Sequence, residues 1–354
     1  MANGRRHTDA LFLLAMVAFW GGAIPHMTLA GSPIGAFQGI SNQETSSQTN
    51  TSKEGGWSHS QGLVSLDFGT SVEAANINRV RYANVFGGSD AGARIAAAIA
   101  DLPDTGGIVD ARGIEGLQVI SSPLTVSKNN VTLLLGAATY ASSANIVIAD
   151  GVRNFHIRGI GNGLPGGTTI SHSAPNCWIS VEPTAAPQGI WIEDLSVMTT
   201  ATSPSSGGIC VGSPLEPYDS AKYRNDWRIR NVTINGPGPS KPGVVGVNLS
   251  QLGRLVLDGV HIIGYETDLV MCATTEATVS GVTLDAFLFG LKHLPNPRYP
   301  SGAGTQDRFL SLTAHGPDIG TTGNAIYEGL SGSQFFGAYL ETGVSTINAA
   351  AMLA

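Results

Sequence analysis

One four-residue phrase recurs along the chain and restricts the fold more than any other feature. In Asn231-Val232-Thr233-Ile234, a residue that tolerates a left-handed backbone precedes an apolar, polar, apolar alternation. The alternation has the period of two that characterises a β-strand, so each copy predicts a tight bend followed by a strand. The other copies begin at Asn130, Asn154, Asp194, Gly259 and Gly281.

The spacing of these copies indicates how the strands are arranged. Consecutive copies are 24, 40, 37, 28 and 22 residues apart. A unit of about 22 residues cannot bury its inner face alone, so successive units must stack on one another. We therefore expect an all-β fold, a right-handed parallel β-helix with three strands per coil. A leucine-rich repeat would need a ladder of leucines, which the sequence lacks.

Longer spacings indicate loops inserted at other corners, which loop-closure entropy tolerates at low cost. The third strand of each coil is expected after the corner that follows each phrase, in residues 177–181, 208–212, 246–250, 268–272, 290–294 and 324–328. Two long loops, 213–226 and 295–306, should leave this third sheet. Loops that rise above regular sheets are the expected location of a functional site.

The N-terminal region reads as three segments. Arg5 and Arg6, an apolar run over residues 10–19 and the sequence Thr28-Leu29-Ala30 predict a signal peptide over residues 1–30, with a membrane anchor as the alternative. Residues 31–75 form a Ser/Thr/Gln-rich leader that we expect to be flexible. The β-helix is then expected over residues 76–354, in a secreted or cell-surface protein without a membrane span in its mature chain.

A helix is expected over residues 91–102, capped by Ser89 or Asp90, where it would cover the first coil. At the other end, Asn348 to Ala354 contain no polar cap. Either the sequence continues beyond this point or something else covers that end.

The segments Asn84 to Gly113 and Ile120 to Gly136 carry a resemblance to a known group. Their order of strand, Ala-rich helix, Gly-Gly pair and Pro-Leu-Thr-Val strand resembles the start of the pectate-lyase superfamily of right-handed parallel β-helices. The resemblance implies a fold and not an activity. The Arg-x-Pro-x-x-Arg run of pectate lyases and the polygalacturonase signatures are absent, so no catalytic residue carries over.

Charge and cysteine content limit the partners and cofactors. The chain has 354 residues and a formal net charge of −7, without a basic tract, which argues against a nucleic-acid partner. Cys177, Cys210 and Cys272 have no metal-ligand spacing, so zinc is not expected, and they are either buried thiols or include one disulfide. No cofactor is expected, and nothing in the sequence indicates calcium or an oligomeric state.

Charged and aromatic residues gather around the two long loops of this charge-poor chain. Aromatic faces and charged groups together are typical of carbohydrate sites, although a solvated loop with local ion pairs is the alternative. The candidate catalytic residues are Asp219, Asp226, Lys292, His293 and Asp307. The candidate substrate-binding residues are Tyr218, Tyr223, Arg224, Trp227, Asn248, Arg298, Tyr299 and Arg308.

Two reactions would use these residues differently. Hydrolysis needs two carboxylates, about 5–5.5 Å apart for retention or about 6.5–9.5 Å for inversion, and Glu216, Asp219, Asp226 and Asp307 are available. β-Elimination from a uronate needs a base and a cation, which Lys292, His293, Arg298 or Arg308 would supply. In contrast, His156 and His261 are expected on a flat sheet without a pocket, where they have no functional role.

We therefore expect an exported protein that acts on acidic, uronic-acid-containing polysaccharide as a lyase or glycoside hydrolase. The alternatives are a non-catalytic glycan-binding or adhesin-like surface protein on the same fold, and a purely structural repeat protein.

Overall fold

Parallel β-strands make up most of the residues that the structure describes. The structure is a computed structural model that describes residues 79–162, 166–214, 223–294, 306–317, 324–328 and 333–341, all within the unit Asp67–Ala354. Every strand pairing in these residues is parallel. The expected all-β architecture built on parallel sheets is confirmed.

Most strands form a large sheet with two rows. The first row runs through β1 (Val80–Tyr82), β2 (Gly107–Ala111), β5 (Val131–Leu135), β8 (Phe155–Arg158), β11 (Trp191–Thr199), β14 (Arg228–Asn235), β17 (Val256–Asp258), β20 (Thr278–Ser280), β23 (Arg308–Leu310) and β26 (Gln334–Phe336). The second row contains β3 (Gly116–Ile120), β6 (Ala138–Ser142), β9 (Thr169–His172), β18 (His261–Ile263), β21 (Thr283–Phe287), β24 (Thr313–Pro317) and β27 (Tyr339–Glu341). The long strands β11 and β14 belong to both rows.

Eight further strands form a separate sheet. It contains β4 (Leu124–Val126), β7 (Ile146–Ile148), β10 (Cys177–Val181), β12 (Gly207–Val211), β15 (Val245–Ser250), β19 (Thr267–Cys272), β22 (Phe289–Leu294) and β25 (Asn324–Glu328). Its last six strands lie where the sequence predicts them, within one residue at each end. A small pair, β13 (Arg224–Asn225) with β16 (Leu252–Gly253), lies at a corner, so the end of the first predicted loop forms a strand.

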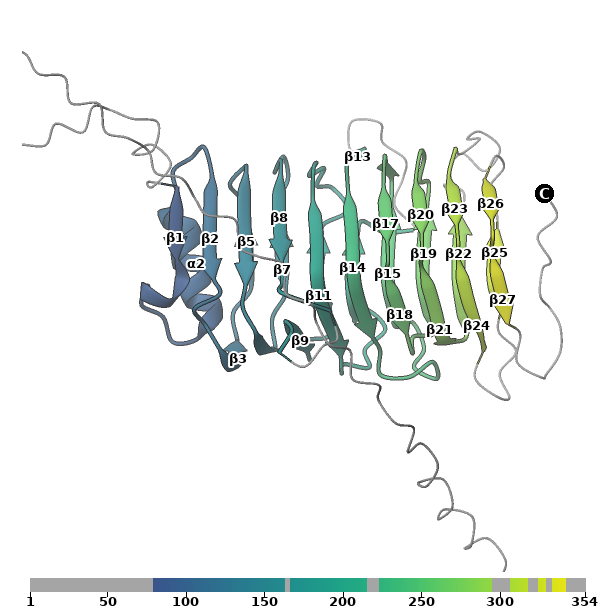
Figure 1. The fold of residues 1–354 in the computed structure, drawn as a ribbon, viewed down its shortest axis with the longest axis horizontal. Helices are drawn as coiled ribbons and strands as arrows, with labels where there is room; N and C mark the ends of the chain where they lie inside the picture. The colour runs from purple at the N-terminus through teal and green to yellow at the C-terminus, as the bar shows by residue number, and fades with distance from the viewer. Residues whose placement is uncertain are drawn as a thin grey trace, which may run out of the picture. The chain divides into compact units, whose positions relative to one another are not determined.

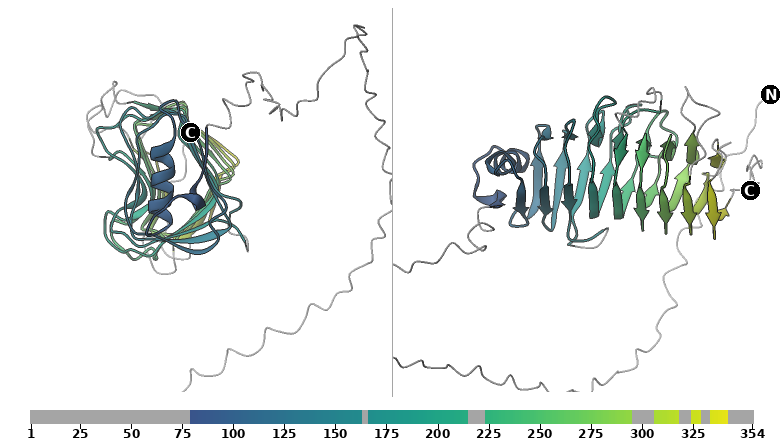
Figure 2. Two further views of the ribbon diagram at one scale, coloured as in Figure 1. Left: turned by 90° about the vertical axis from the view of Figure 1, so that its left-hand side faces the viewer. Right: turned by 90° about the horizontal axis from the view of Figure 1, so that it is seen from above.

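We call one passage of the chain through the two rows and the eight-stranded sheet a unit. Successive units lie side by side in chain order (Figures 1 and 2). Their register is kept although their lengths differ, because Trp191 pairs with Arg228, 37 residues later, and Val256 pairs with Thr278, only 22 residues later. Extra residues are therefore absorbed at the corners.

The bends explain which residues start the repeated phrase. All six predicted pivots have a positive φ: 54° at Asn130, 58° at Asn154, 57° at Asp194, 50° at Asn231, 60° at Gly259 and 58° at Gly281. The predicted left-handed bends are confirmed. However, the six copies belong to two different bends, and the sequence-based alignment of them as one series was wrong.

The register shows the difference between the two bends. Asn130 and Asn154 precede strands of the first row, because Phe155 pairs with Val131 and His156 pairs with Trp191. Asp194 and Asn231 lie between the first and second rows, within β11 and β14. His156 is therefore in line with Trp191, and not with Ser196 as the phrase alone implied.

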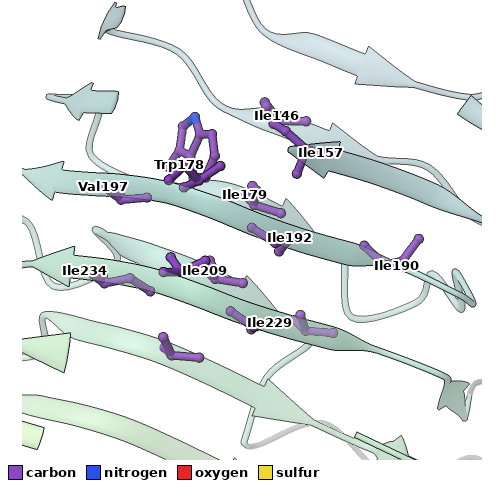
Figure 3. Packing of buried hydrophobic residues seen from close by; sticks show 14 of the residues in the cluster. Ile146, Ile157, Trp178, Ile179, Ile190, Ile192, Val197, Ile209, Ile229 and Ile234 are labelled. Atoms are coloured by element: carbon purple, nitrogen blue, oxygen red, sulfur yellow. The ribbon is translucent and has the colours of Figure 1, made fainter. Parts of the chain in front are cut away.

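Apolar side chains from every unit fill the space between the sheets. Ile157, Ile192 and Ile229 hold the same register in β8, β11 and β14, and all three are fully buried. Figure 3 shows such isoleucines repeated from strand to strand. Each buries its side chain against the units on either side, which is why a single unit would not fold alone.

A short helical segment lies between β1 and β2. It contains the 3₁₀-helix η1 (Ala83–Val85) and the α-helix α2 (Ala91–Asp101). The Asp90 carboxylate accepts the Ala93 N–H at 2.7 Å, which confirms the predicted N-cap. The helix buries Ile95, Ala98 and Ile99. The sequence missed β1, which pairs with β2 ahead of the predicted first strand.

The cysteines resolve the two alternatives left by the sequence. Cys177 of β10 and Cys210 of β12 form a disulfide that joins adjacent strands of the eight-stranded sheet. Cys272 is buried, and its thiol donates to the carbonyl of Pro214 at 3.6 Å. In the part of the chain that is described, no helix has the length and apolarity needed to cross a bilayer.

Candidate functional site

An open groove of about 560 Å³ lies where the bend meets the first row of strands. We call it the arginine groove. Its lining comprises Arg153, Asn154, His156, Gln188, Gly189, Trp191, Asp226, Trp227, Arg228, Arg254 and Val256. The prediction that His156 lies on a sheet without a pocket is therefore wrong.

A stack of three side chains forms the floor of the groove. His156, Trp191 and Arg228 hold one register position in β8, β11 and β14. The imidazole stacks on the indole at 4.1 Å between ring centroids, and the guanidinium carbon of Arg228 lies 4.6 Å from the indole centroid. Because the two neighbours come from the preceding and the following unit, both faces of Trp191 are covered. The indole presents its edge to the groove.

The rim is the row of bend residues that precedes these strands. Asn154, Gly189, Asp226 and Arg254 occupy it, and the two charged members pair at 2.9 Å between Arg254 Nη2 and Asp226 Oδ2. Arg254 has φ 53°, a conformation in which arginine is uncommon and costs on the order of 1 kcal/mol. Most equivalent bends hold Asn or Gly, but the next one along the chain holds another long charged residue, Glu276, at φ 57°.

The groove is electropositive in an acidic protein. Three arginines, Arg153, Arg228 and Arg254, face one carboxylate, Asp226, whereas the whole chain carries a net charge of −7. Burial lowers the pKa of His156; Glu193 opposes this shift and Arg228 adds to it. The imidazole is thus neutral at pH 7 and gains charge only in acid. Guanidinium groups bind carboxylates and sulfates through paired hydrogen bonds, so this arrangement suits an anionic ligand.

Two of the residues predicted from the sequence belong to the groove. Asp226 lies at its exposed rim, in the ion pair with Arg254. Trp227 contributes to the lining, but its side chain is fully buried and its indole N–H donates to the carbonyl of Pro187 at 3.3 Å. Its role is to hold the corner below the groove.

The predicted binding residue Arg224 is completely buried. Its guanidinium donates to the backbone carbonyls of Ala185, Ser250, Glu182 and Pro183 at 2.8 to 3.3 Å. A cation enclosed by carbonyl acceptors is not accessible to a ligand at the surface. Arg224 therefore ties three segments of chain together at the corner instead of contributing to a site.

Two further predicted residues close to it are also engaged with the backbone. The Tyr223 hydroxyl donates to the carbonyl of Ala273 at 3.1 Å. Asn248 faces outward on β15, as expected, but it is only 8% exposed and donates to the carbonyl of Gly212 at 3.1 Å.

The predicted catalytic pair His293 and Asp307 meets inside the protein. His293 Nε2 lies 3.0 Å from Asp307 Oδ2, and both side chains are 0% exposed. The carboxylate also accepts the hydroxyl of Thr274 at 2.6 Å and the N–H of Ala277 at 2.8 Å. The pair thus satisfies the polar groups of a buried corner and is closed to a surface substrate.

Lys292 and Arg308 are accessible and lie on different sheets. Lys292 is half-buried on the eight-stranded sheet, with its ammonium 3.6 Å from the ring centroid of Phe289. Burial lowers its pKa, and Glu266 opposes this shift. Arg308 is exposed on β23, in the first row, and does not line the groove. Their sequence neighbours His293 and Asp307 are in contact, but among the described residues no contact is seen between the side chains of Lys292 and Arg308.

The remaining predicted residues, Tyr218, Asp219, Arg298 and Tyr299, and the additional carboxylate Glu216, lie outside the described residues. The groove residues that the sequence missed are Arg153, His156, Trp191, Arg228 and Arg254. The sequence does contain a signal for three of them, because His156, Trp191 and Arg228 occupy equivalent positions in three consecutive units. This signal was missed because the phrase at Asn154 was aligned with the wrong bend.

Comparison with known proteins gives little further information. No family model matches the chain, and no curated protein matches it. A solved structure of the Geobacillus virus E2 protein ORF18 aligns with 76% of this chain at 10% identity and a TM-score of 0.34. The alignment spans 63% of the length of that viral protein.

Proposed function

We propose that this protein binds an acidic, uronic-acid-containing polysaccharide through the arginine groove, as an exported, non-catalytic glycan-binding protein. The observation that carries the proposal is the gathering of Arg153, Arg228 and Arg254 around one groove of a chain whose net charge is −7. A whole-molecule field of this sign repels polyanions, so a local cluster of cations is needed to hold one.

The carboxylates favour binding over hydrolysis. Among the described lining residues the groove holds one carboxylate, Asp226, and this group is paired with Arg254. Glycoside hydrolysis generally uses two carboxylates on opposite sides of the scissile bond. The expected lyase or hydrolase activity consequently has less support than the binding role.

The fold proposal behind this function is a right-handed parallel β-helix with α2 as the cap of its first coil. Strands that pair in parallel one unit after another support it, since connections between parallel strands of one sheet are nearly always right-handed. The helix supports the capping role because Ile95 and Ile99 are buried within the core cluster. This architecture is the one implied by the resemblance to the pectate-lyase superfamily.

Export is the remaining part of the proposal. The predicted signal peptide, residues 1–30, and the leader lie outside the described residues. The Cys177–Cys210 disulfide supports an oxidising compartment, where such bonds persist. Mass spectrometry of the protein recovered from the medium tests this, because cleavage after Ala30 leaves a chain that begins at Gly31. Recovery of the uncleaved chain from the membrane fraction would show an anchor.

The binding proposal is tested with polygalacturonate and two groove variants, Arg228→Gln and Arg254→Asn. Asparagine tolerates the left-handed bend, so Arg254→Asn removes the charge without backbone strain. Loss of one charge-assisted contact of about 1.5–3 kcal/mol predicts a fall in affinity of roughly tenfold or more for each variant. Isothermal titration calorimetry measures it, with thermal melts to confirm folding.

Matched controls remove the same charge elsewhere. Arg308→Gln changes an exposed arginine in the same row, and Lys292→Gln changes a cation on the eight-stranded sheet. Neither should alter the affinity by more than about twofold, because neither residue lines the groove and the effect of an exposed charge is weakened by salt over a Debye length of about 10 Å. If the controls lose binding while the groove variants keep it, the site lies elsewhere.

A further inference from the structure

The arginine groove crosses four consecutive units. His156, Trp191, Arg228 and Val256 are successive partners in the parallel register. The bend row repeats this order, because the N–H of Asn154 donates to the carbonyl of Gln188 and the N–H of Asp226 donates to the carbonyl of Gly253. The long direction of the groove is therefore the direction in which the units stack.

The stacking distance fixes the length of the groove. Neighbouring strands of a sheet lie about 4.8 Å apart, so the first and fourth units are separated by about 14 Å. This span exceeds one sugar ring and matches a short stretch of a linear oligosaccharide. A ligand that lies along the stack would place consecutive sugars over consecutive units.

Within the groove, the three arginines are spaced along this span. Arg153 belongs to the first unit, Arg228 to the third and Arg254 to the fourth. Arg153 is exposed at one end of the groove, and Arg254 forms an ion pair with Asp226 at the other end. The ends lie farther apart than the Debye length of about 10 Å at 0.1 M salt, so each acts on a different ligand charge.

The floor of the groove does not provide a flat aromatic platform. His156 and Arg228 cover both faces of the Trp191 indole, which leaves its edge toward the ligand. A neutral sugar ring thus has no aromatic face to cover here, and the spaced charges must supply most of the recognition.

We infer that the arginine groove selects linear polyanionic glycans by length: it binds a stretch of several uronate units that lies along the stack of β-strands, and it binds short uronates and neutral glycans weakly. This inference rests on the proposed function and adds the shape and orientation of the ligand. Contacts at the two ends are joined by the ligand chain, so the second contact gains from a high effective concentration.

The test is a titration with oligogalacturonates from the dimer to the octamer at fixed salt. Affinity should rise by at least about 30-fold from the dimer until the chain spans the groove, and then change by less than about threefold, as multivalent contacts predict. Malto-oligosaccharides of the same lengths should bind at least about tenfold more weakly, because they offer no carboxylate to the guanidinium groups.

Arg153→Gln supplies the matched variant. Arg153 is exposed, and its loss should reduce the ratio of octamer to dimer affinity by roughly tenfold, because the end contact is removed. Arg308→Gln should leave this ratio unchanged. Thermal melts establish that both variants are folded.

The outcomes separate the inference from the function on which it rests. Failure of the wild type to bind any oligogalacturonate would defeat the proposed function. Binding that is independent of length, or a length dependence that survives Arg153→Gln, would overturn the inference and leave the function intact. An oligothymidylate of similar length that binds as tightly as the octamer would overturn the inference too, since the groove would then not select glycans.

Discussion

The imidazole of His156 lies parallel to the indole of Trp191, with ring centroids 4.1 Å apart and 6° between the planes. The two residues are 35 positions apart in sequence but are direct partners in β8 and β11. The contact couples a titratable group to the floor of the arginine groove. It gives the groove a charge that depends on pH.

Uronate affinity should increase as the pH falls from 7 to 5. Burial keeps the pKa of His156 below its ordinary value of 6.5, so the protonated form gains population only as the solution becomes acidic. A bound carboxylate favours the imidazolium, which means that binding takes up a proton and strengthens as the pH falls. The gain should be at most about tenfold for each unit by which the ligand raises the pKa.

Calorimetric titrations at several pH values measure this dependence. His156→Gln keeps a polar side chain without a titration, and its affinity should be nearly constant between pH 7 and 5. An equally steep pH profile in this variant would show that another group carries the effect.

The bend at Asn231 should tolerate glycine but not valine. Its φ of 50° is left-handed, where a β-branched side chain is strained, so Asn231→Val should lower the free energy of unfolding by about 1–3 kcal/mol. Asn231→Gly loses two exposed hydrogen bonds, from Asn231 Nδ2 to Asp194 Oδ1 and from Asn162 Nδ2 to Asn231 Oδ1, and should cost about 1 kcal/mol. Denaturant unfolding of both variants distinguishes them; equal stabilities would contradict the strain argument.

Arg224 should affect stability and leave the ligand affinity unchanged. Replacement by methionine keeps the volume but deprives the carbonyls of Ala185, Ser250 and Pro183 of their donor, which should cost about 3 kcal/mol or more. Urea unfolding measures the loss, and calorimetry below the transition measures binding. A stable variant with lost binding would restore Arg224 to the ligand site.

The Cys177–Cys210 disulfide should stabilise the fold by about 2–4 kcal/mol, since it closes a separation of 33 residues in the unfolded chain. Unfolding midpoints of the wild type with and without a reductant test this. The double variant Cys177→Ala/Cys210→Ala should resemble the reduced wild type and should not respond to the reductant. A response in that variant would place the sensitive bond elsewhere.

The repeated phrase carried most of the information about the fold. Its bend residues, such as Asn231, and the positions of β10 to β25 follow from local backbone preference and alternation, which act over a few residues. The same phrase misled the alignment at Asn154, because two bends of one unit both favour left-handed residues. Local preference fixes that a bend occurs, whereas only strand pairing shows which bend it is.

The site was harder to predict because burial depends on residues far apart in sequence. The sequence placed Arg224 in a charged loop and His293 at the end of a strand, both as surface ligands. The carbonyl of Ala185 and the carboxylate of Asp307 instead bind them inside the corners. In contrast, Trp191 and Arg228 look like isolated residues until the register makes them neighbours. Composition indicated the chemistry of the groove, and pairing determined its location.

The constant register has a consequence for how such a protein can be resized. Because the chain from Arg228 to Leu255 fills one unit, and the next strand begins at the equivalent residue Val256, its removal would bring β11 against β17 with every inward side chain still facing inward. Deleting or inserting a whole unit therefore shortens or lengthens the stack by about 4.8 Å, and the length of any groove that crosses that unit changes by the same amount.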